Sequence, residues 1–239
     1  MMHRAGHMAL AVCFALAFSA QAAKGATDPP PAGTAVGDAT ALYNAGTIAL
    51  ERGAVGPSVT FLLAAVRLEP RAADVRTNLA NALVAAAHAA GDEERSDDAA
   101  PIPLAAGEAW WLAAVVLAIG AMLGIAHAIV GLSWPARWIG NGLMIVGIAL
   151  SAWTHYAAWE ESAHPEAVVI APTLSVERGP EEPSRPAVLL SAGERVRLGV
   201  ERAGRIEVRL GSVRIGWAAR EGLWRVADAP RYTSEFRPQ

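Results

Sequence analysis

Five hydroxyl and amide residues are the side chains of this chain best suited to hold another molecule. Tyr43, Asn44 and Thr47 stand close together, and Asn78 and Asn81 form a second group further along. An asparagine amide both donates and accepts hydrogen bonds, so paired asparagines can hold a peptide backbone in both directions. Such groups suit contact with a partner protein rather than a reaction, and these five residues are the candidates for that role.

Residue types that perform catalysis or bind metals do not occur in any familiar arrangement. The sequence has no Gly-rich phosphate loop, no Gly-x-Ser-x-Gly and no helical His/Glu spacing for zinc. Its single cysteine, Cys13, lies in the first apolar run, which leaves no disulfide or thiolate metal site for a mature chain. His88 and His164 have no evident partner in the sequence. We predict a protein that is not an enzyme and that holds no cofactor and no metal.

Composition indicates a membrane protein. The 239 residues are 53% hydrophobic and 18% charged, with a net charge of −3. Soluble domains carry about 25% charged residues, so the deficit points to segments that lie in lipid. A slightly acidic chain without a basic patch has no electrostatic reason to bind nucleic acid. We expect a lipid bilayer, and no nucleic acid, among its partners.

Two apolar stretches, Trp110–Leu132 and Trp138–Trp159, predict a transmembrane helical hairpin over residues 109–159. Each is long enough to cross a bilayer, which requires about 20 apolar residues. The linker Ser133–Arg137 is too short to form a domain, so the segments on either side of the hairpin would lie on the same side of the membrane.

Small and aromatic residues support this hairpin. Glycines on both stretches would allow the helices to pack closely, and tryptophans stand mostly near the ends, as interfacial aromatic residues do. Whether His127 and His155 do more than pack or reach the interface is left open. The glycines are Gly120, Gly124, Gly140 and Gly147, and the tryptophans are Trp110, Trp111, Trp134, Trp138, Trp153 and Trp159.

Residues 1–23 have the form of a signal peptide. Arg4 precedes an apolar core, Met8–Ala20, and Ala20-Gln21-Ala22 offers a cleavage site. Whether this segment is cleaved or kept as an anchor, it places the residues after it outside the cytoplasm. Residues 24–38, rich in proline and glycine, are predicted to be a linker.

Residues 39–90 show the apolar spacing of a helical unit. One expected helix presents Leu42, Ala45 and Ala49 on a single face, and a second presents Val59, Leu62 and Val66. A third helical pattern covers 73–90, and residues 91–108 come next as an acidic, proline-containing tether.

After residue 164 the apolar period changes to two, which indicates strands. Arg195–Leu198, Arg205–Leu210 and Val213–Ile215 alternate charged and apolar residues, and Gly193, Ala203-Gly204 and Gly211-Ser212 supply turns. We predict a small antiparallel barrel or sheet of about five strands over 164–227, with 228–239 as a C-terminal tail.

Ala39–Ala72 resembles a tetratricopeptide repeat. Tyr43-Asn44-Ala45-Gly46 and Leu68-Glu69-Pro70 match its motifs, and Ser58 and Ala65 stand at small positions. The resemblance implies that the first helices line a concave face carrying the five candidate binding residues. One and a half repeats are fewer than the three or so that such arrays require, so we expect this unit to pack on itself, on the hairpin or on a partner. An ordinary helical hairpin without a binding role is the alternative.

The β segment resembles the bacterial SH3-like domain. Leu174–Pro180 is similar to the family's Leu-Asn-Val-Arg-Ser-Gly-Pro, and Gly216-Trp217 stands for its Gly-Trp. Arg205 replaces the tryptophan usual before the third strand, which is a departure from the family's aromatic ligand groove. A structural β module without a ligand is the alternative.

The order of these parts resembles the BatE-like proteins of bacterial aerotolerance operons. That resemblance implies a multi-pass inner-membrane scaffold or adaptor whose N- and C-terminal domains face the periplasm. It also implies membrane or periplasmic partners, among them von Willebrand factor A-type proteins of the same operon, in a complex linked to aerotolerance or envelope stress. The alternative function is a peptidoglycan- or peptide-binding SH3-like module that the hairpin anchors.

Overall fold

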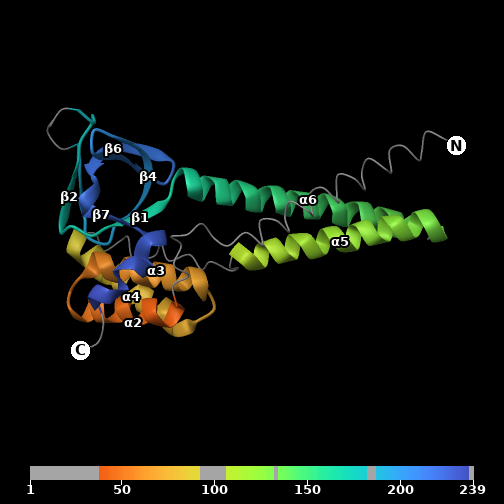
Figure 1. Ribbon diagram of the computed structural model, residues 1–239, viewed down its shortest axis with the longest axis horizontal. Helices are drawn as coiled ribbons and strands as arrows, with labels where there is room; N and C mark the ends of the chain where they lie inside the picture. Colours follow the sequence, from red (N-terminus) through yellow and green to blue (C-terminus); the bar gives the residue numbers. More distant parts are fainter. Residues whose placement is uncertain (1–37, 92–105, 132–133, 182–186, 237–239) are drawn as a thin grey trace. The chain divides into compact units, whose positions relative to one another are not determined.

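The computed structural model of the protein describes residues 38–91, 106–131, 134–181 and 187–236 (Figure 1). The expected signal peptide 1–23, the linker at 24–37 and the tether between 92 and 105 lie outside the described residues. The described part is a mixed helix and sheet fold. Its elements fall into three groups: the helices α2–α4, the helices α5–α6, and the strands β1–β7 with the 3-10 helices η2 and η3.

The helices α2–α4 have the predicted apolar faces. On the first helix, the predicted residues Leu42, Ala45 and Ala49 are buried. On the second helix, the predicted residues Val59, Leu62 and Val66 are buried as well. Asp38 caps the first helix by accepting a hydrogen bond from the Thr40 backbone at 3.0 Å. The bounds are α2 Ala39–Glu51, α3 Val55–Leu68 and α4 Ala73–Ala90.

Small residues bring α2 and α3 together, as predicted. A Cβ atom at Gly46 would lie 2.6 Å from Cγ of Leu62, so a larger residue there would force the helices apart. The Ser58 hydroxyl donates a hydrogen bond to the Gly46 carbonyl at 2.9 Å, which satisfies a buried polar group across the helix pair.

The strands form a five-stranded antiparallel sheet in the order β6-β5-β4-β1-β7 and a two-stranded sheet, β2-β3. The predicted turns are present: Gly193, Gly204 and Gly211 all have positive φ, and so does Ala203. The bounds are β1 Glu166–Val169, β2 Thr173–Val176, β3 Val188–Ser191, β4 Arg195–Arg202, β5 Arg205–Leu210, β6 Val213–Ala219 and β7 Leu223–Arg225, with η2 at Arg220–Gly222.

Glu207 breaks the alternation of exposed and buried side chains along strand β5. It is buried, although its position in the pattern predicts a solvent-exposed side chain. Glu207 lies opposite Trp217 in the sheet register. Its carboxyl group lies over Gly199 of β4, where a Cβ atom would be 3.0 Å from Cδ of Glu207. The missing side chain at Gly199 therefore makes room for this carboxylate.

Residues 228–236 pack against the rest of the folded chain and do not form the expected C-terminal tail. They belong to the 3-10 helix η3, Val226–Phe236, in which Val226 and Ala229 are buried. Tyr232 stacks on Trp224 with ring centroids 4.1 Å apart, and Phe236 meets Phe61 of α3 edge-on at 5.4 Å. These aromatic residues bury enough apolar surface to hold the segment in place.

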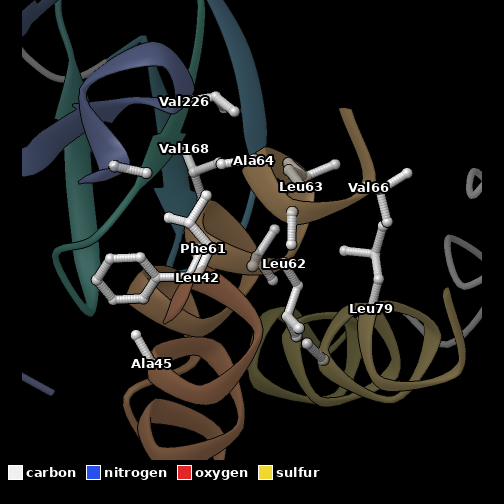
Figure 2. Packing of buried hydrophobic residues seen from close by; sticks show 14 of the residues in the cluster. Leu42, Ala45, Phe61, Leu62, Leu63, Ala64, Val66, Leu79, Val168 and Val226 are labelled. Atoms are coloured by element: carbon white, nitrogen blue, oxygen red, sulfur yellow. The ribbon is translucent and has the colours of Figure 1, made fainter. Parts of the chain in front are cut away.

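The helices α2–α4 share one apolar core with the sheet and η3 (Figure 2). Phe61 and Leu62 are fully buried, and Val168 of β1 and Val226 of η3 pack in the same cluster. The short helical unit was expected to pack on itself, on the hairpin or on a partner. The structure shows a further arrangement, in which the β segment of the same chain covers it. We call α2–α4, β1–β7 and η2–η3 together the body.

Helices α5 (Ala106–Val130) and α6 (Trp134–Ala163) correspond to the two predicted apolar stretches. The connection is shorter than expected, because α5 continues to Val130, before Gly131 with its φ of 67°, and α6 starts at Trp134 with Pro135 in its first turn. The two helices pack closely at Gly120, Gly140 and Gly147; a Cβ atom at Gly147 would lie 2.6 Å from Cγ of Leu117. Gly124 differs, since no side-chain or backbone atom lies within 4 Å of its Cβ position.

Among the described helices, one is long and apolar enough to cross a membrane, Glu108–Val130 within α5. Helix α6 is long but less apolar. Asn141 interrupts its apolar run, and His155, Glu160 and Glu161 lie toward its end.

Candidate functional site

Three of the five predicted binding residues are linked by hydrogen bonds. The Asn78 amide nitrogen on α4 donates to the Thr47 hydroxyl oxygen on α2 at 3.0 Å. The Thr47 hydroxyl in turn donates to the Tyr43 carbonyl at 3.0 Å. Asn78 and Thr47 therefore join the two helices to each other, a structural role that the sequence did not reveal.

The other two predicted residues are free to meet solvent. Asn44 on α2 and Asn81 on α4 are exposed, and Tyr43 is half-buried against the core cluster. All five residues lie on α2 and α4. The hydrogen bond between Thr47 and Asn78 holds these two helices side by side. The two helices thus carry two exposed amides, Asn44 and Asn81, and one hydrogen-bonded pair, Thr47 with Asn78.

A cavity of about 390 Å³ lies between α4 and the sheet. One wall is the apolar face of the C-terminal half of α4, and the other is the start of β4 with the turn before it. The packing is tight at one edge, where a Cβ atom at Gly193 would lie 2.5 Å from Cβ of Ala86. The lining includes Leu83, Ala86, Ala87, Ala90, Glu166, Glu194, Arg195, Arg197 and Leu210.

A network of ion pairs lies where the body meets α6. Arg67 on α3 contacts Glu161 of α6 at 3.0 Å and Glu166 of β1 at 2.5 Å. Arg195 on β4 also holds Glu166, at 2.7 Å. One carboxylate thus joins the helical unit to the sheet, and one arginine joins both to α6.

The charge of Glu166 is stabilised by its surroundings. Burial alone would raise the pKa of its carboxyl group. The guanidinium groups of Arg195 and Arg67 outweigh this effect through their charge and hydrogen bonds, so the pKa lies below its usual value. Glu166 is therefore ionised at neutral pH and acts as a fixed anion between two cations.

Two further groups of pairs extend this network. Arg197 contacts Glu160 of α6 at 3.2 Å, and His164 lies 3.7 Å from the same carboxylate. At the start of α5, both oxygens of Glu108 accept hydrogen bonds from Arg71, at 2.7 and 3.1 Å. Sequence reasoning missed these residues, because pairs so distant in the chain leave no spacing pattern.

The SH3-like resemblance does not extend to an open aromatic groove. Trp217 is only 3% exposed and belongs to the folded interior of the sheet. Arg205, which stands where that family has a tryptophan, forms an ion pair with Glu177. A partner would therefore meet charged groups here rather than an aromatic surface.

A ring contact joins a histidine of α6 to the start of α5. The His155 ring meets Trp110 edge-on, with centroids 4.7 Å apart, which places the end of α6 beside the start of α5. Within the described ranges, no three His, Cys, Asp or Glu side chains are grouped so that they could hold a metal ion.

Comparison of the chain with known protein families, curated proteins and solved structures finds no match.

Proposed function

We propose that the protein is a membrane-anchored adaptor without enzymatic activity. Helices α5 and α6 cross the bacterial inner membrane as a hairpin, and the body lies on the periplasmic side. The body binds membrane or periplasmic proteins through the face that carries Tyr43, Asn44, Thr47, Asn78 and Asn81. A role in aerotolerance or envelope stress, as in BatE-like proteins, belongs to the same proposal.

The observation that carries this proposal is the direction of the apolar side chains on α5 and α6. Small residues face the partner helix, while Ile129 and Ile145 are 78% and 68% exposed. A water-soluble helix pair would bury such residues. Lipid is the solvent that accepts them, for α6 as well as for α5.

Aromatic residues at the helix ends support a two-helix crossing. Trp111 on α5 and Trp159 on α6 are exposed at the body end, and Trp134 and Trp138 are exposed at the connection. Such residues occupy both membrane interfaces. The contact between Trp110 and His155 brings the body ends of the two helices together. This supports the proposal that the segments before α5 and after α6 lie on the same side of the membrane.

The binding role is tested by capture of partners from solubilised membranes. The double variant Asn44→Ala/Asn81→Ala removes the two exposed amides and is expected to abolish capture of membrane proteins. Thr173→Ala, an exposed polar substitution on β2 and therefore on neither α2 nor α4, is the matched control. Undiminished capture by the double variant would contradict the proposed face.

Topology is tested by a reporter fused after Gln239 that is active only outside the cytoplasm. We expect activity, since an even number of crossings after the signal segment returns the chain to the periplasm. A reporter active only in the cytoplasm would overturn the arrangement.

The second candidate is a peptidoglycan- or peptide-binding β module that α5 and α6 merely anchor. Sedimentation of the full chain with purified murein separates the two. Retention on murein, lost in Arg205→Ala but not in Asn44→Ala/Asn81→Ala, would favour this candidate. The buried Trp217 and the paired Arg205 give it less support than the adaptor has.

A further inference from the structure

The covalent link between the body and α6 is very short. Helix α6 ends at Ala163 and β1 begins at Glu166, which leaves His164 and Pro165 between them. Proline cannot continue a helical hydrogen-bond pattern, so the helix ends here and the chain changes direction. The His164 backbone N–H donates to the Glu160 carbonyl of α6 and the Pro165 carbonyl accepts from Leu198 of β4, so the backbone between these two residues is the pivot of the joint.

Apolar packing does not fix the angle between α6 and the body. The two apolar clusters among the described residues contain members of α2–α4, the strands and η3, and none from α5 or α6. The contacts at this joint are instead ionic. Arg67 reaches Glu161, Arg197 reaches Glu160 and Arg71 reaches Glu108.

The charges at this joint are balanced. Three arginines of the body meet three carboxylates at the body ends of α5 and α6, and each arginine comes from a different part of the body: α3, the turn after it, and β4. Ion pairs with partly exposed side chains are weak compared with a buried apolar core and are lost when either charge is removed.

We propose that Arg67, Arg71 and Arg197 with Glu108, Glu160 and Glu161 form an ion-pair clasp that sets the angle between the body and α5–α6. His164-Pro165 is its hinge. The clasp opens when the carboxylates are neutralised, and the body then swings as a unit. The clasp itself depends only on the observed pairs; its use in presenting the binding face to a partner rests on the proposed function.

The other charged groups at the joint do not replace these pairs. His164 faces Glu160 at 3.7 Å and Arg209 of β5 at 3.5 Å, between an anion and a cation. Arg195 faces Glu166, which is part of the body. Loss of the three helix carboxylates would therefore leave Arg67, Arg71 and Arg197 without their anions on α5 and α6.

The test uses the full chain in detergent micelles with Cys13→Ser as background. Spin labels at Ala80→Cys on α4 and Ala152→Cys on α6, both exposed positions, report the distance across the joint by double electron–electron resonance. We expect one narrow distance peak in the parent chain. The triple variant Glu108→Gln/Glu160→Gln/Glu161→Gln should lose that narrow peak.

Two controls make the result decisive. Glu201→Gln breaks a pair of similar length, Arg220–Glu201 at 2.7 Å, that lies within the body, and should leave the peak narrow. A second label pair, Ala80→Cys with Val213→Cys, reports distances inside the body and should stay narrow in the triple variant. A narrow peak across the joint in the triple variant would overturn the clasp, as would broadening of both label pairs.

These outcomes are independent of the proposed adaptor function. A chain whose joint opens as expected, yet which captures no partner, would retain the clasp and lose the adaptor. A chain that captures partners with a rigid joint would lose the clasp alone.

Discussion

Helices α2–α4 and helices α5–α6 pack through the same kind of close glycine contact, but they direct their large apolar side chains in opposite ways. In both groups, glycine at a crossing point lets two helices approach: Gly46 against Leu62 in the first, Gly147 against Leu117 in the second. Large apolar side chains then point inward in the first group (Figure 2) and outward in the second. The direction of the apolar side chains, rather than their number, therefore distinguishes α2–α4 from α5–α6.

The largest effect is expected from a change in the inward-facing group. Phe61→Ala removes a fully buried ring that meets both Trp224 and Phe236. It should lower the free energy of unfolding by about 3–5 kcal/mol, measured by urea denaturation of the full chain in detergent. Val84→Ala, on the exposed side of α4, should change it by less than about 0.5 kcal/mol. Equal losses in the free energy of unfolding for the two variants would contradict the inward packing of the large apolar side chains of α2–α4.

The next effect concerns the outward-facing group. Ile148→Asp places a carboxylate at the middle of α6, where insertion into a bilayer should become less favourable by about 2.5–3.5 kcal/mol. Ile119→Asp at the middle of α5 serves as the reference, since α5 is apolar enough to span. Membrane insertion assays should show similar losses for both. Normal insertion of Ile148→Asp beside a failing Ile119→Asp would show that only α5 crosses.

A third prediction concerns the carboxylate that joins the helical unit to the sheet. Glu166→Gln should lower the free energy of unfolding by about 1.5–3 kcal/mol at pH 7, because two charge-assisted hydrogen-bonded pairs are lost. Denaturation at several pH values measures the difference from the parent chain.

The pH dependence of that difference has a definite sign. The folded-state pKa of Glu166 is lowered, so its contribution is complete well above the unfolded value of about 4.3. It is lost as the pH falls through the lower folded-state pKa. The gap between Glu166→Gln and the parent chain should therefore close in acid. A gap that is constant down to about pH 2 would show that charge is not its cause.

The smallest effect compares two glycines of the same helix. Gly147→Val on α6 would place side-chain atoms against Leu117 and should destabilise the helix pair by about 1–3 kcal/mol. Gly142→Val meets open space, with no atom within 4 Å of its Cβ position. Disulfide crosslinking between cysteines introduced on α5 and α6 should slow in the first variant alone. Similar rates for both would mean that the crossing tolerates larger residues.

Local patterns in the sequence were sufficient to place most elements. Leu42, Ala45 and Ala49 predicted the buried face of α2, and β5 begins and ends at the predicted Arg205 and Leu210. Glycine positions such as Gly193 and Gly204 predicted turns, and both residues have positive φ in the structure. Each of these signals depends on neighbours a few residues away, which is why a single sequence reveals them.

Long-range packing could not be predicted in the same way. Tyr232 and Phe236 have neither helical nor strand spacing, so residues 228–239 were predicted to be a tail; only the folded chain shows their contacts with Trp224 and Phe61. Glu207 was expected in water because nothing in β5 itself shows that Gly199 leaves space for it.

The sequence suggested which residues to consider for the candidate site, but not the hydrogen bonds and ion pairs among the residues around it. Tyr43, Asn44, Thr47, Asn78 and Asn81 were chosen because the resemblance to a tetratricopeptide repeat implies a concave face on these helices and because their side chains can form hydrogen bonds; all lie on α2 and α4. The hydrogen bond between Thr47 and Asn78 was not foreseen, since its two partners are 31 positions apart. The arginines of the clasp gave no signal at all, because an ion pair requires only charge and proximity.

The covering of Phe61 by η3 sets an order for biosynthesis. The ribosome makes α2 and α3 first, then α5 and α6, and only afterwards the aromatic residues that complete the core around Phe61. Such contacts between distant parts of a chain form slowly. The helical unit must therefore wait, with part of its apolar surface uncovered, while α5, α6 and the strands are being made. A chaperone that shields α3 during that interval would help this chain more than one that acts on the finished protein.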